Sequence, residues 1–426
     1  MARREPRVAR LGSFPVKRLC AATVCVAIGL TACSGDPRGA AFESPALSAA
    51  RDTNESTAKA YEFLQLMLDE YTSGSTPRLV QSFDGGPLKK FTDAVTYDDA
   101  LFVDAAMTRG TAADVRRAKV IGNAFLYVQK YDKAGDGRLR AAYAPKPLRA
   151  PGDVVVDDNT SDVGNMAWVG QALVQLYAVT SERAYLNGAL AIANWLQTST
   201  YDARGHGGYT GGYTAAGKKI EWKSTEHNID IYAFFTMLAT ESGSSAWTTH
   251  AAWAETFVAS MWDADAGRFY VGTTNDGITP NKSFKPEDVN SWSYLAFENP
   301  QWARAPGWDV TNLAVDENGF GGVSFCTGDR SGVWFEGTAH LADALEYRNE
   351  TGDAAQAATY LDDVRYAQAN GPNGDGRGII AASKTISDCD GDRYFPSLHV
   401  GATAWYVLAE QQANPFRLHF GLPFKR

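Results

Sequence analysis

The sequence predicts an all-α fold, an (α/α)6 toroid in which six helical hairpins form two concentric rings. Three observations predict it. Six segments begin with a polar cluster and continue almost wholly apolar, as helices buried on all sides do. Segments with one apolar stripe lie between them, as expected of peripheral helices. Strand patterning is sparse and falls in short aromatic stretches, which suit hairpins in loops.

The two predicted rings alternate along the chain. The inner segments lie at 96–110, 164–180, 224–243, 288–300, 332–352 and 397–415. The outer segments lie at 58–72, 112–129, 183–197, 245–262 and 353–368, and a sixth, the least clear, falls between 300 and 316. A superhelix of tetratricopeptide-type repeats is the competing all-α fold, but no fixed period of about 34 residues is present.

The first 32 residues have the pattern of an export signal. A basic run is followed by the apolar stretch LCAATVCVAIGL, which is short for a membrane span. The sequence LTAC at 30–33 resembles the bacterial lipobox, which implies cleavage before Cys33 and a lipid on its sulfur; an ordinary secretory peptide is the alternative. Residues 33–55 are predicted to be a flexible tether, and 56–426 to be the toroid. We therefore expect an exported protein, lipid-anchored to a bacterial membrane in the periplasm or at the cell surface.

The charge of the chain excludes one class of partner. The first 32 residues contain six of the 40 Lys and Arg and one of the 49 Asp and Glu, so the exported chain carries 34 basic and 48 acidic residues, a net charge of −14. No basic stripe remains, which argues against a nucleic-acid partner. No other apolar run is long enough to cross a membrane. The membrane is thus expected as a partner only through the lipid, and the protein is expected to be a monomer.

Two cysteines remain after the signal and the lipidation site, Cys326 and Cys389. In an exported domain such a pair is more often a disulfide than a site. Free thiols are the alternative, and a metal or catalytic role is the least favoured. The histidines show no H-x-x-x-H spacing, so no metal site is predicted.

Six helical hairpins whose loops at one rim carry acidic and aromatic residues resemble the six-hairpin glycosidase superfamily. The resemblance covers about residues 56–416 and rests on architecture and on the places of the polar clusters, because no full signature of one hydrolase family is matched. It implies a carbohydrate substrate and no cofactor, since most members are inverting glycoside hydrolases. Related toroids include sugar 2-epimerases, unsaturated-uronide hydrolases and polysaccharide lyases.

The polar tips of the inner segments supply the candidate catalytic residues. In KSTEHNIDIYAFF (223–235), Ser224 or Thr225 is a plausible N-cap, and Glu226 and Asp230 share one face of the helix. The helix macrodipole alone would favour Glu226, but it does not explain the polar residues beside it, His227, Asn228 and Asp230. In a toroid these tips would surround one open groove, so we interpret them as a site.

Hydrolysis of a glycosidic bond needs a carboxylic acid that protonates the leaving oxygen and a carboxylate that activates water. The candidates, in order of preference, are Glu226, Glu336, Asp99, Asp98, Asp230 and Asp288. The apolar surroundings of Glu336 are expected to raise its pKa, as a general acid needs. Glu226 could play the same part, with Asp98 or Asp99 as the base. The alternative for the Asp pair is a helix N-terminus that attracts anions.

Histidines and aromatic residues at the same tips are candidates for substrate binding. The histidines are His227, His340 and His399, for which hydrogen bonds to sugar hydroxyls, a structural role and an epimerase-like catalytic role are considered in that order. Aromatic rings bury the flat C–H faces of sugars at small entropic cost. The aromatic candidates are Tyr97, Trp168, Trp222, Trp292, Trp334 and Trp405, and Asn228 is added as a polar contact. Each aromatic residue is equally compatible with the core.

Two further motifs in the sequence do not indicate a binding site. SDCDGDRYF (387–395) places acidic residues at alternate positions but lacks the later Glu of an EF-hand, so a solvated loop is expected. RGHGGYTGGY (204–213) lacks the G-K-[ST] of a phosphate loop and is predicted to be a rim hairpin.

Three hypotheses for function follow. The first is a lipid-anchored glycoside hydrolase acting on a poly- or oligosaccharide. The second is a lyase or sugar 2-epimerase on the same toroid; the acidic charge argues mildly against a uronide substrate, with Lys218, Lys219 and Lys223 as the counter-signal. The third is a non-catalytic glycan-binding lipoprotein.

Overall fold

The computed structural model describes residues 45–421, with side chains described from residue 55 onward. The chain divides into a short unit, Met1–Pro45, and a compact unit that begins at Ala46. The predicted signal, Cys33 and most of the predicted tether therefore lie outside the described residues. In the part that is described, no helix is long and apolar enough to cross a membrane.

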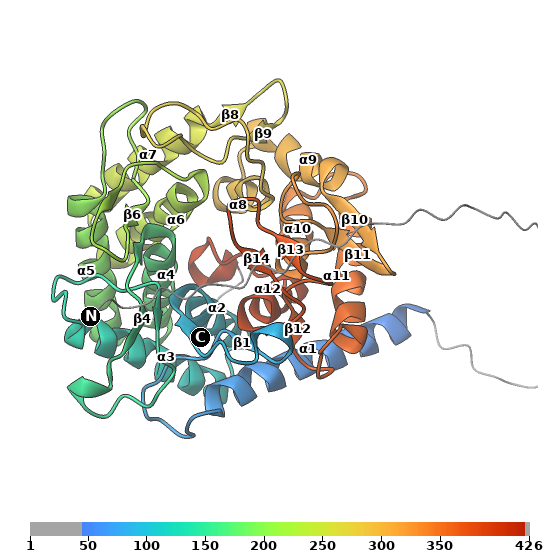
Figure 1. The fold of residues 1–426 in the computed structure, drawn as a ribbon, viewed down its shortest axis with the longest axis horizontal. Helices are drawn as coiled ribbons and strands as arrows, with labels where there is room; N and C mark the ends of the chain where they lie inside the picture. Colours follow the sequence, from blue (N-terminus) through green and yellow to red (C-terminus); the bar gives the residue numbers. More distant parts are fainter. Residues whose placement is uncertain (1–44, 422–426) are drawn as a thin grey trace, which may run out of the picture. The chain divides into compact units, whose positions relative to one another are not determined.

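Twelve α-helices of the described part form two rings (Figure 1). The inner helices are α2 (Thr96–Arg109), α4 (Val163–Thr180), α6 (Thr225–Ser242), α8 (Asp288–Phe297), α10 (Phe335–Arg348) and α12 (Val400–Glu410). The outer helices are α1 (Pro45–Asp69), α3 (Ala112–Tyr131), α5 (Arg183–Ser199), α7 (Ser245–Ser260), α9 (Arg304–Asn312) and α11 (Asp353–Asn370). Each inner helix contacts the next, and α12 contacts α2. The ring is closed, which confirms the predicted (α/α)6 toroid.

Each hairpin consists of an outer helix followed by an inner helix, and the two differ as their sequences require. The inner helices are buried almost all round; in α4 every residue from Met166 to Leu176 is buried. The outer helices bury one stripe and leave the other faces to water, as in α5. The least clear outer segment is α9, which is short because Pro306 and Gly307 are poor helix formers.

Helix α1 begins earlier than the sequence predicts. Its backbone is helical from Pro45, so residues 45–55 of the predicted tether belong to a helix. Proline is favoured in a first helical turn, and the alanine-rich stretch after it has good helix propensity. The predicted boundary at residue 56 is therefore too late for the helix. From Ser56 on, α1 packs on the rings, and the Ser56 hydroxyl lies 2.6 Å from that of Tyr406 in α12.

Short antiparallel strands at one rim lie in the connections between the outer and the inner helix of each hairpin. They form six small sheets: β1 (Phe83–Asp84), β15 (Leu398–His399) and β12 (Ile379–Ile380); β2 (Ala94–Val95), β3 (Ala142–Tyr143) and β4 (Val156–Asp158); β5 (Ser161–Asp162), β6 (Gly212–Tyr213) and β7 (Lys219–Ile220); β8 (Trp262–Asp263) and β9 (Arg268–Phe269); β10 (Ala314–Glu317) and β11 (Phe320–Val323); β13 (Ile386–Ser387) and β14 (Arg393–Tyr394). The glycine-rich segment 204–213 leads into β6, so the predicted rim hairpin is confirmed.

Short 3-10 helices complete the connections, at Gly86–Leu88, Pro151–Asp153, Pro300–Trp302 and Leu418–Gly421. The last follows α12, and the segment between the two carries Phe416 back beneath the ring. Phe416 packs against the rings of Trp168 and Trp292 at 5.2 and 5.6 Å. This contact closes the axis of the toroid on the side away from the rim strands.

Candidate active site

The first turns of the six inner helices share one register. Counting starts at the first residue with helical backbone; for α8 this is Glu287, whose φ is −72° and ψ −49°. The second residues of the turns are Tyr97, Gly164, Glu226, Asp288, Glu336 and Gly401. All but Gly401 line one cavity of about 240 Å³ on the axis of the toroid. The predicted convergence of the polar tips around a shared hollow is therefore found.

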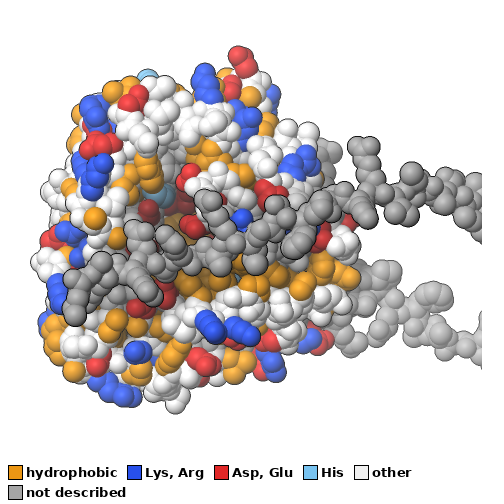
Figure 2. All heavy atoms as spheres, viewed as in Figure 1, with side chains coloured by type: hydrophobic (Ala, Val, Ile, Leu, Met, Phe, Trp, Pro, Cys, Tyr) orange, Lys and Arg blue, Asp and Glu red, His pale blue; other side chains and the backbone are white. Residues whose placement is uncertain are grey.

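The sixth residues of the same turns lie one helical turn deeper. They are Leu101, Trp168, Asp230, Trp292, His340 and Trp405. The indole rings of Trp168, Trp292 and Trp405 pack on one another with centroids 5.4 to 5.8 Å apart. Trp168, Asp230 and Trp292 line the cavity and form its floor. In Figure 2 acidic side chains and a histidine gather in a hollow near the centre of the face toward the viewer.

The fourth residues have a structural task in five of the six helices. Each accepts a hydrogen bond of 2.8 to 3.0 Å from a backbone N–H of the rim segment that precedes its helix. The pairs are Asp99 with Val80, Asn228 with Tyr209, Asn290 with Phe269, Thr338 with Val323 and Thr403 with Ile379. The repeat attaches each rim segment to an inner helix, which explains why a polar residue recurs at this buried place.

This repeat changes the interpretation of two candidates. Asp99 is fully buried and binds the Val80 N–H, and Asn228 is fully buried and also donates to the carbonyls of Tyr209 and Ser224. Neither lines the cavity. The structure therefore places them in the scaffold, away from the cavity, where each binds a rim segment.

Glu336 stands in a basic and hydrogen-bonded environment. Its Oε1 accepts from the Tyr97 hydroxyl at 2.7 Å, and its Oε2 lies 3.3 Å from His399 Nδ1. His340 Nε2 lies 3.7 Å from Oε1. Burial alone would raise the pKa of Glu336, but His340, His399 and Tyr97 together hold it below the usual range. The sequence-based expectation of a raised pKa is wrong because the effect of burial is outweighed by His340, one turn further along α10, and by His399 and Tyr97, which lie far away in the sequence.

Both histidines are held in turn by further carboxylates. His399 Nε2 lies 3.2 Å from Asp98 Oδ1, and His340 Nδ1 lies 3.1 Å from Glu287 Oε2. Burial disfavours the charge of His340, yet Glu287 and Glu336 outweigh it and raise its pKa to about 9. Asp98 and Glu336 likewise raise the pKa of His399. Carboxyl groups and imidazoles thus alternate in one row of contacts, with Glu336 at its centre: Asp98, His399, Glu336, His340 and Glu287.

Glu226 has the opposite environment. Burial raises its pKa well above the usual range, and the nearby charges of Asp288, Asp230, Asp162 and Glu336 raise it further. Burial and Glu287 raise the pKa of Asp288 to about 7. Burial and the charges of Asp162 and Asp288 raise the pKa of Asp230 well above its usual range, although the Trp168 side chain offsets part of the effect. The surroundings of Glu226 therefore favour its protonated form, and those of Glu336 favour its ionised form.

The structure brings together most of the predicted site residues. Those that line the cavity are Glu226, Glu336, Asp230, Asp288, Tyr97, Trp168, His227, Trp292 and Trp334. Those that stand behind Glu336 or below the cavity are Asp98, His340, His399 and Trp405. The indole N–H of Trp405 donates to the Tyr97 hydroxyl at 2.8 Å. Trp222 packs beside His227, with ring centroids 5.8 Å apart, and does not line the cavity.

Five lining residues were not predicted: Asp162, Gly164, Asn165, Phe325 and Tyr394. Gly164 and Asn165 stand at the second and third places of the first turn of α4, so a register common to the inner segments would have indicated them. Asp162 precedes them and caps α4 through the Asn165 N–H at 3.1 Å. Phe325 and Tyr394 come from loops, where no periodicity marks a residue that reaches the axis.

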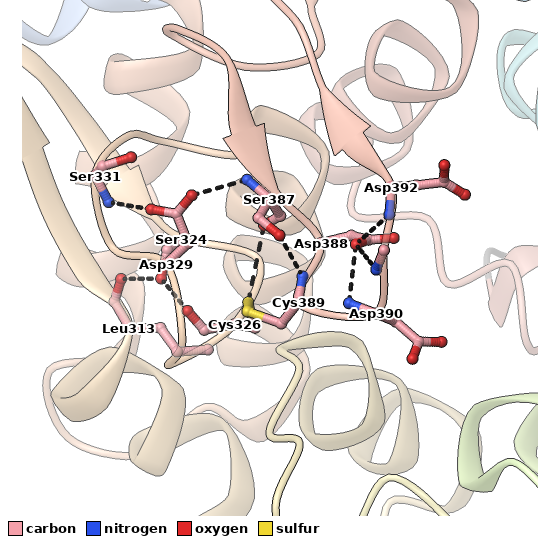
Figure 3. The surroundings of a disulfide bond; sticks show 11 residues. Leu313, Ser324, Cys326, Asp329, Ser331, Ser387, Asp388, Cys389, Asp390 and Asp392 are labelled. Atoms are coloured by element: carbon pink, nitrogen blue, oxygen red, sulfur yellow. Dashed lines mark hydrogen bonds between the residues drawn. A yellow bond between two sulfur atoms is a disulfide. The ribbon is translucent and has the colours of Figure 1, made fainter. Parts of the chain in front are cut away.

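A disulfide holds the two loops that carry Phe325 and Tyr394. Cys326 and Cys389 are bonded across a sequence separation of 63 residues (Figure 3), which confirms the predicted bridge. Asp329 reinforces it by accepting the Ser387 N–H at 2.8 Å. The rings of Phe325 and Tyr394 lie 5.4 Å apart. The wall of the cavity beside α10 is therefore covalently fixed.

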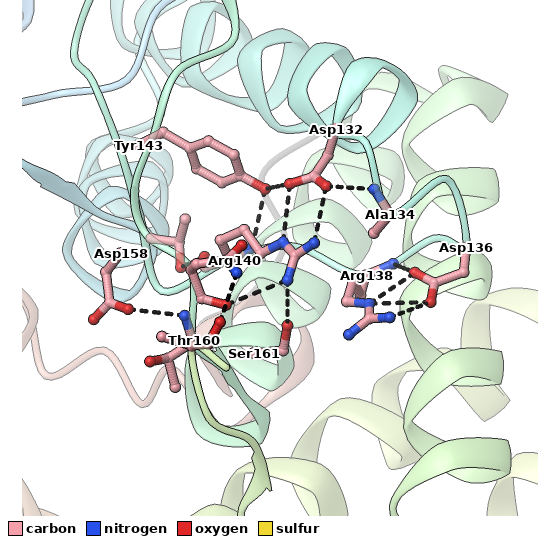
Figure 4. A network of polar contacts seen from close by, with 12 residues as sticks. Asp132, Ala134, Asp136, Arg138, Arg140, Tyr143, Asp158, Thr160 and Ser161 are labelled. Carbon is pink, nitrogen blue, oxygen red and sulfur yellow. Dashed lines mark hydrogen bonds and ion pairs between the residues drawn. The ribbon is translucent and has the colours of Figure 1, made fainter. Parts of the chain in front are cut away.

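A polar network fixes the rim segment that follows α3 (Figure 4). Asp132 binds the Arg140 guanidinium, at 3.1 Å from Nε and 3.2 Å from Nη2, and accepts the Tyr143 hydroxyl at 3.1 Å. Tyr143 belongs to β3, which pairs with β2 immediately before α2. The network thereby holds the strand that leads to Tyr97.

In residues 55–421 no three His, Cys, Asp or Glu side chains are arranged to hold a metal ion. The loop at 387–392 forms an Asx turn in which the Asp388 carboxylate accepts the N–H groups of Asp390, Gly391 and Asp392 at 2.9 to 3.0 Å. This turn accounts for the alternating acidic residues there.

No family model matches the sequence, and no curated protein is significantly similar to it. Solved structures do share its architecture. D-mannose isomerase matches with a TM-score of 0.61 at 14% identity, over 87% of this chain and 98% of that one. Cellobiose 2-epimerase from Bacillus thermoamylovorans B4167 matches with 0.62 at 11%, over 84% and 98%. A glycosidase variant in complex with glucose matches with 0.59 at 14%, over 87% and 98%.

These matches cover nearly the whole length of each neighbour, and at this level of identity they establish the fold. The fold that they share with this chain is the (α/α)6 toroid, as the sequence predicted.

Proposed function

We propose that the protein is a glycoside hydrolase that uses Glu226 as general acid and Glu336 as general base. One observation carries the proposal: two glutamates at the same register position of inner helices have pKa values displaced in opposite directions. Carboxyl groups whose environments push their pKa values apart are the pattern of an acid–base pair. The neighbours that share the fold include a glycosidase crystallised with glucose.

The proposed reaction follows the inverting scheme. Glu226 gives its proton to the oxygen of the leaving group as the glycosidic bond breaks. Glu336 takes a proton from the water whose oxygen bonds to the anomeric carbon. The Tyr97 hydroxyl orients Glu336, and Trp405 orients Tyr97. Glu226 and Glu336 stand on α6 and α10, with α8 between them, and both line the cavity. Asp288, with a pKa of about 7, is the second candidate for the acid.

A sugar 2-epimerase or isomerase is the alternative, because two of the neighbours have these activities by name. A histidine base for such a reaction would need to be neutral and to reach the substrate. His340 is protonated at neutral pH, since its pKa is about 9, and neither His340 nor His399 lines the cavity. These observations favour hydrolysis, and they assign the histidines to the support of Glu336.

Product analysis tests the proposal directly. The purified chain is incubated with a panel of oligosaccharides and p-nitrophenyl glycosides, and the products are followed by reducing-end assay and NMR. Hydrolysis gives a new reducing end for each bond cleaved, and inversion gives the opposite anomer first. An epimer formed without a new reducing end would assign the alternative, and an unsaturated uronide would assign a lyase. Ligand binding with none of these products would indicate a glycan-binding protein.

Export and lipid attachment at Cys33 are proposed on the sequence pattern alone. Metabolic labelling with a radioactive fatty acid tests this, with Cys33→Ser as the control that should lose the label. Label retained by that variant would place the lipid elsewhere.

A further inference from the structure

The described residues that line the cavity are rich in carboxyl groups and aromatic rings, and His227 is the one imidazole among them. Five carboxyl groups line it: Asp162, Glu226, Asp230, Asp288 and Glu336. Six aromatic rings accompany them, from Tyr97, Trp168, Trp292, Phe325, Trp334 and Tyr394. No Lys or Arg is among the described residues that line it. Aromatic faces and carboxylates both attract a positive charge.

The lysines near this rim do not supply a positive charge to the cavity. The Lys223 ammonium donates to the carbonyls of Asp202, Arg204 and Gly207 at 2.8 to 3.0 Å. Its charge is thus used to close the loop that precedes β6. Lys218 and Lys219 lie on the rim beside β7 and do not line the cavity. These lysines therefore give no support to an anionic substrate.

The helix N-termini explain how the carboxyl groups coexist. The positive ends of the inner helices point toward the cavity, and each favours negative charge near it. Glu226, Asp288 and Glu336 all lie in first turns, so the protein's own carboxyl groups occupy the helix N-termini around the cavity. One carboxyl group is left without a hydrogen-bond donor. Asp230 is fully buried at the cavity floor, and its two oxygens accept no hydrogen bond of normal geometry.

We propose that the sugar residue bound in this cavity is an amino sugar with a free ammonium group. The inference rests on the proposed function and names its substrate class. An ammonium close to Asp230 would supply donors that this carboxylate lacks, while the Trp168 and Trp292 rings cover the apolar face of the sugar. A uronic acid would bring a further carboxyl group into a cavity whose lining already holds five, so we expect it not to bind.

The size of the cavity sets how much of the substrate it holds. At about 240 Å³ it is smaller than the roughly 300–1,000 Å³ of pockets for drug-sized ligands. It therefore accommodates a single sugar residue. Together with a floor closed by tryptophans, this predicts removal of a terminal residue from an oligosaccharide, with the rest of the chain outside the rim.

Calorimetry on free monosaccharides tests the charge of the ligand without relying on hydrolysis. The full chain is titrated at pH 7 with D-glucosamine, D-galactosamine and D-mannosamine, and with glucose, galactose, mannose, their N-acetylamino forms and glucuronate. We expect one amino sugar to bind at least about tenfold more tightly than its neutral and N-acetylated counterparts, and glucuronate not to bind. Equal or tighter binding of the neutral sugar would overturn the proposal, since the carboxyl groups would then serve only the positive charge of the transition state.

Proton release gives a second, independent readout. A cation favours the ionised form of carboxyl groups whose pKa is raised, so its binding should expel protons and should weaken as the pH falls from 7 to 5. Titrations in two buffers with different heats of ionisation measure the number of protons. Binding of the amino sugar without proton release, at an affinity independent of pH, would contradict the assignment.

Two variants locate the ammonium. Asp230→Asn should reduce the preference for the amino sugar about tenfold and change neutral-sugar binding little. Asp162→Asn is the partner variant if Asp230→Asn fails to fold, because Asn caps a helix as well as Asp does. Asp265→Asn removes one exposed charge outside the cavity and is the matched control. A preference left intact in both cavity variants would overturn the proposal. Hydrolysis that fails on every glycoside while this preference persists would contradict only the proposed function.

Discussion

At the tips of α6 and α10 a glutamate occupies the second place of the first turn, Glu226 in one helix and Glu336 in the other. Both point into the same cavity, and both are largely removed from solvent. Around Glu226 stand other carboxyl groups, whereas around Glu336 stand two imidazoles and a phenol. The place in the helix decides where a carboxyl group points, and the neighbouring helices decide whether it keeps its proton.

Replacing each glutamate by glutamine should have the largest effects. We expect Glu226→Gln and Glu336→Gln each to lower kcat about 10²–10⁴-fold, the usual contribution of general acid–base catalysis. Glu336→Gln should remove the acidic limb of the pH–rate profile, and Glu226→Gln the basic limb. The thermal midpoint of each variant serves as the folding control. Exchanged limbs would reverse the two roles, and unchanged rates in both variants would remove both residues from the mechanism.

Removal of the disulfide, which distinguishes the α10 side of the cavity from the α6 side, should have the next largest effect. The loops beside α10 are joined by Cys326–Cys389, and no bridge holds the tip of α6. The double variant Cys326→Ser with Cys389→Ser should lose about 4 kcal/mol of unfolding free energy in the loop-entropy model for this separation. Urea unfolding measures it, with the reduced parent chain as the matched control. A change below about 1 kcal/mol would show that the loops are held by packing instead.

The imidazoles of the α10 side should make stability depend on pH. His340 binds its proton more tightly in the folded chain, so its stabilisation is complete below about pH 6.5 and is lost as the pH rises through about 9. The raised pKa of Asp288 acts in the same direction below about pH 7. We expect the unfolding free energy to fall by roughly 2–3 kcal/mol between pH 6.5 and 9.

His340→Gln is the variant that isolates this contribution. It should flatten the decline measured by urea unfolding at pH 6.5, 7.5 and 9, while it lowers stability at pH 6.5 because Glu287 loses its partner. A decline of the same size in this variant would assign the pH dependence to other groups.

A smaller effect is expected from Asp98, which supports Glu336 only through His399. Asp98→Asn should lower the pKa of His399. This should in turn raise the pKa of Glu336 and move the acidic limb of kcat/KM to higher pH, by about one unit or less. The basic limb, which belongs to Glu226, should stay in place. A fall in rate that is uniform across pH would indicate that Asp98 only maintains the packing.

The smallest effect is expected from Asp99→Asn. Asparagine occupies the equivalent place in α6, where Asn228 binds a backbone N–H in the way that Asp99 binds that of Val80. Its amide oxygen should keep this hydrogen bond, so kcat should change less than about twofold and stability should be equal or slightly higher. A large loss of kcat with the fold retained would return Asp99 to the catalytic candidates.

The helices were predictable because their signals are local. The change from polar to apolar in 224–243, for example, follows from where a helix meets solvent, and Ser224 caps α6 as expected, accepting the His227 N–H at 3.3 Å. The disulfide followed from two cysteines in a predicted exported domain. The start of α1 was missed because the composition of a flexible tether and that of an alanine-rich helix overlap.

The site was predictable only in part. Glu226 and Glu336 could be selected by their position at helix tips, but Asp99 and Asn228 have the same position and serve the rim strands. The second and fourth places of the first turn are two residues apart, which is a rotation of about 200° around the helix. This rotation turns a side chain from the axis of the toroid toward the rim. Tyr394 and Phe325 carry no periodic signal at all.

The amino-acid sequence was therefore sufficient for the number of helices, their order in two rings and the chemical character of their tips. The protonation of those tips was settled by the closed ring, since Glu336 meets His399 and Tyr97 only when α12 and α2 close on α10. Periodicity is a property of neighbouring residues, whereas the pKa of a buried carboxyl group depends on charges that other helices bring within a few ångströms.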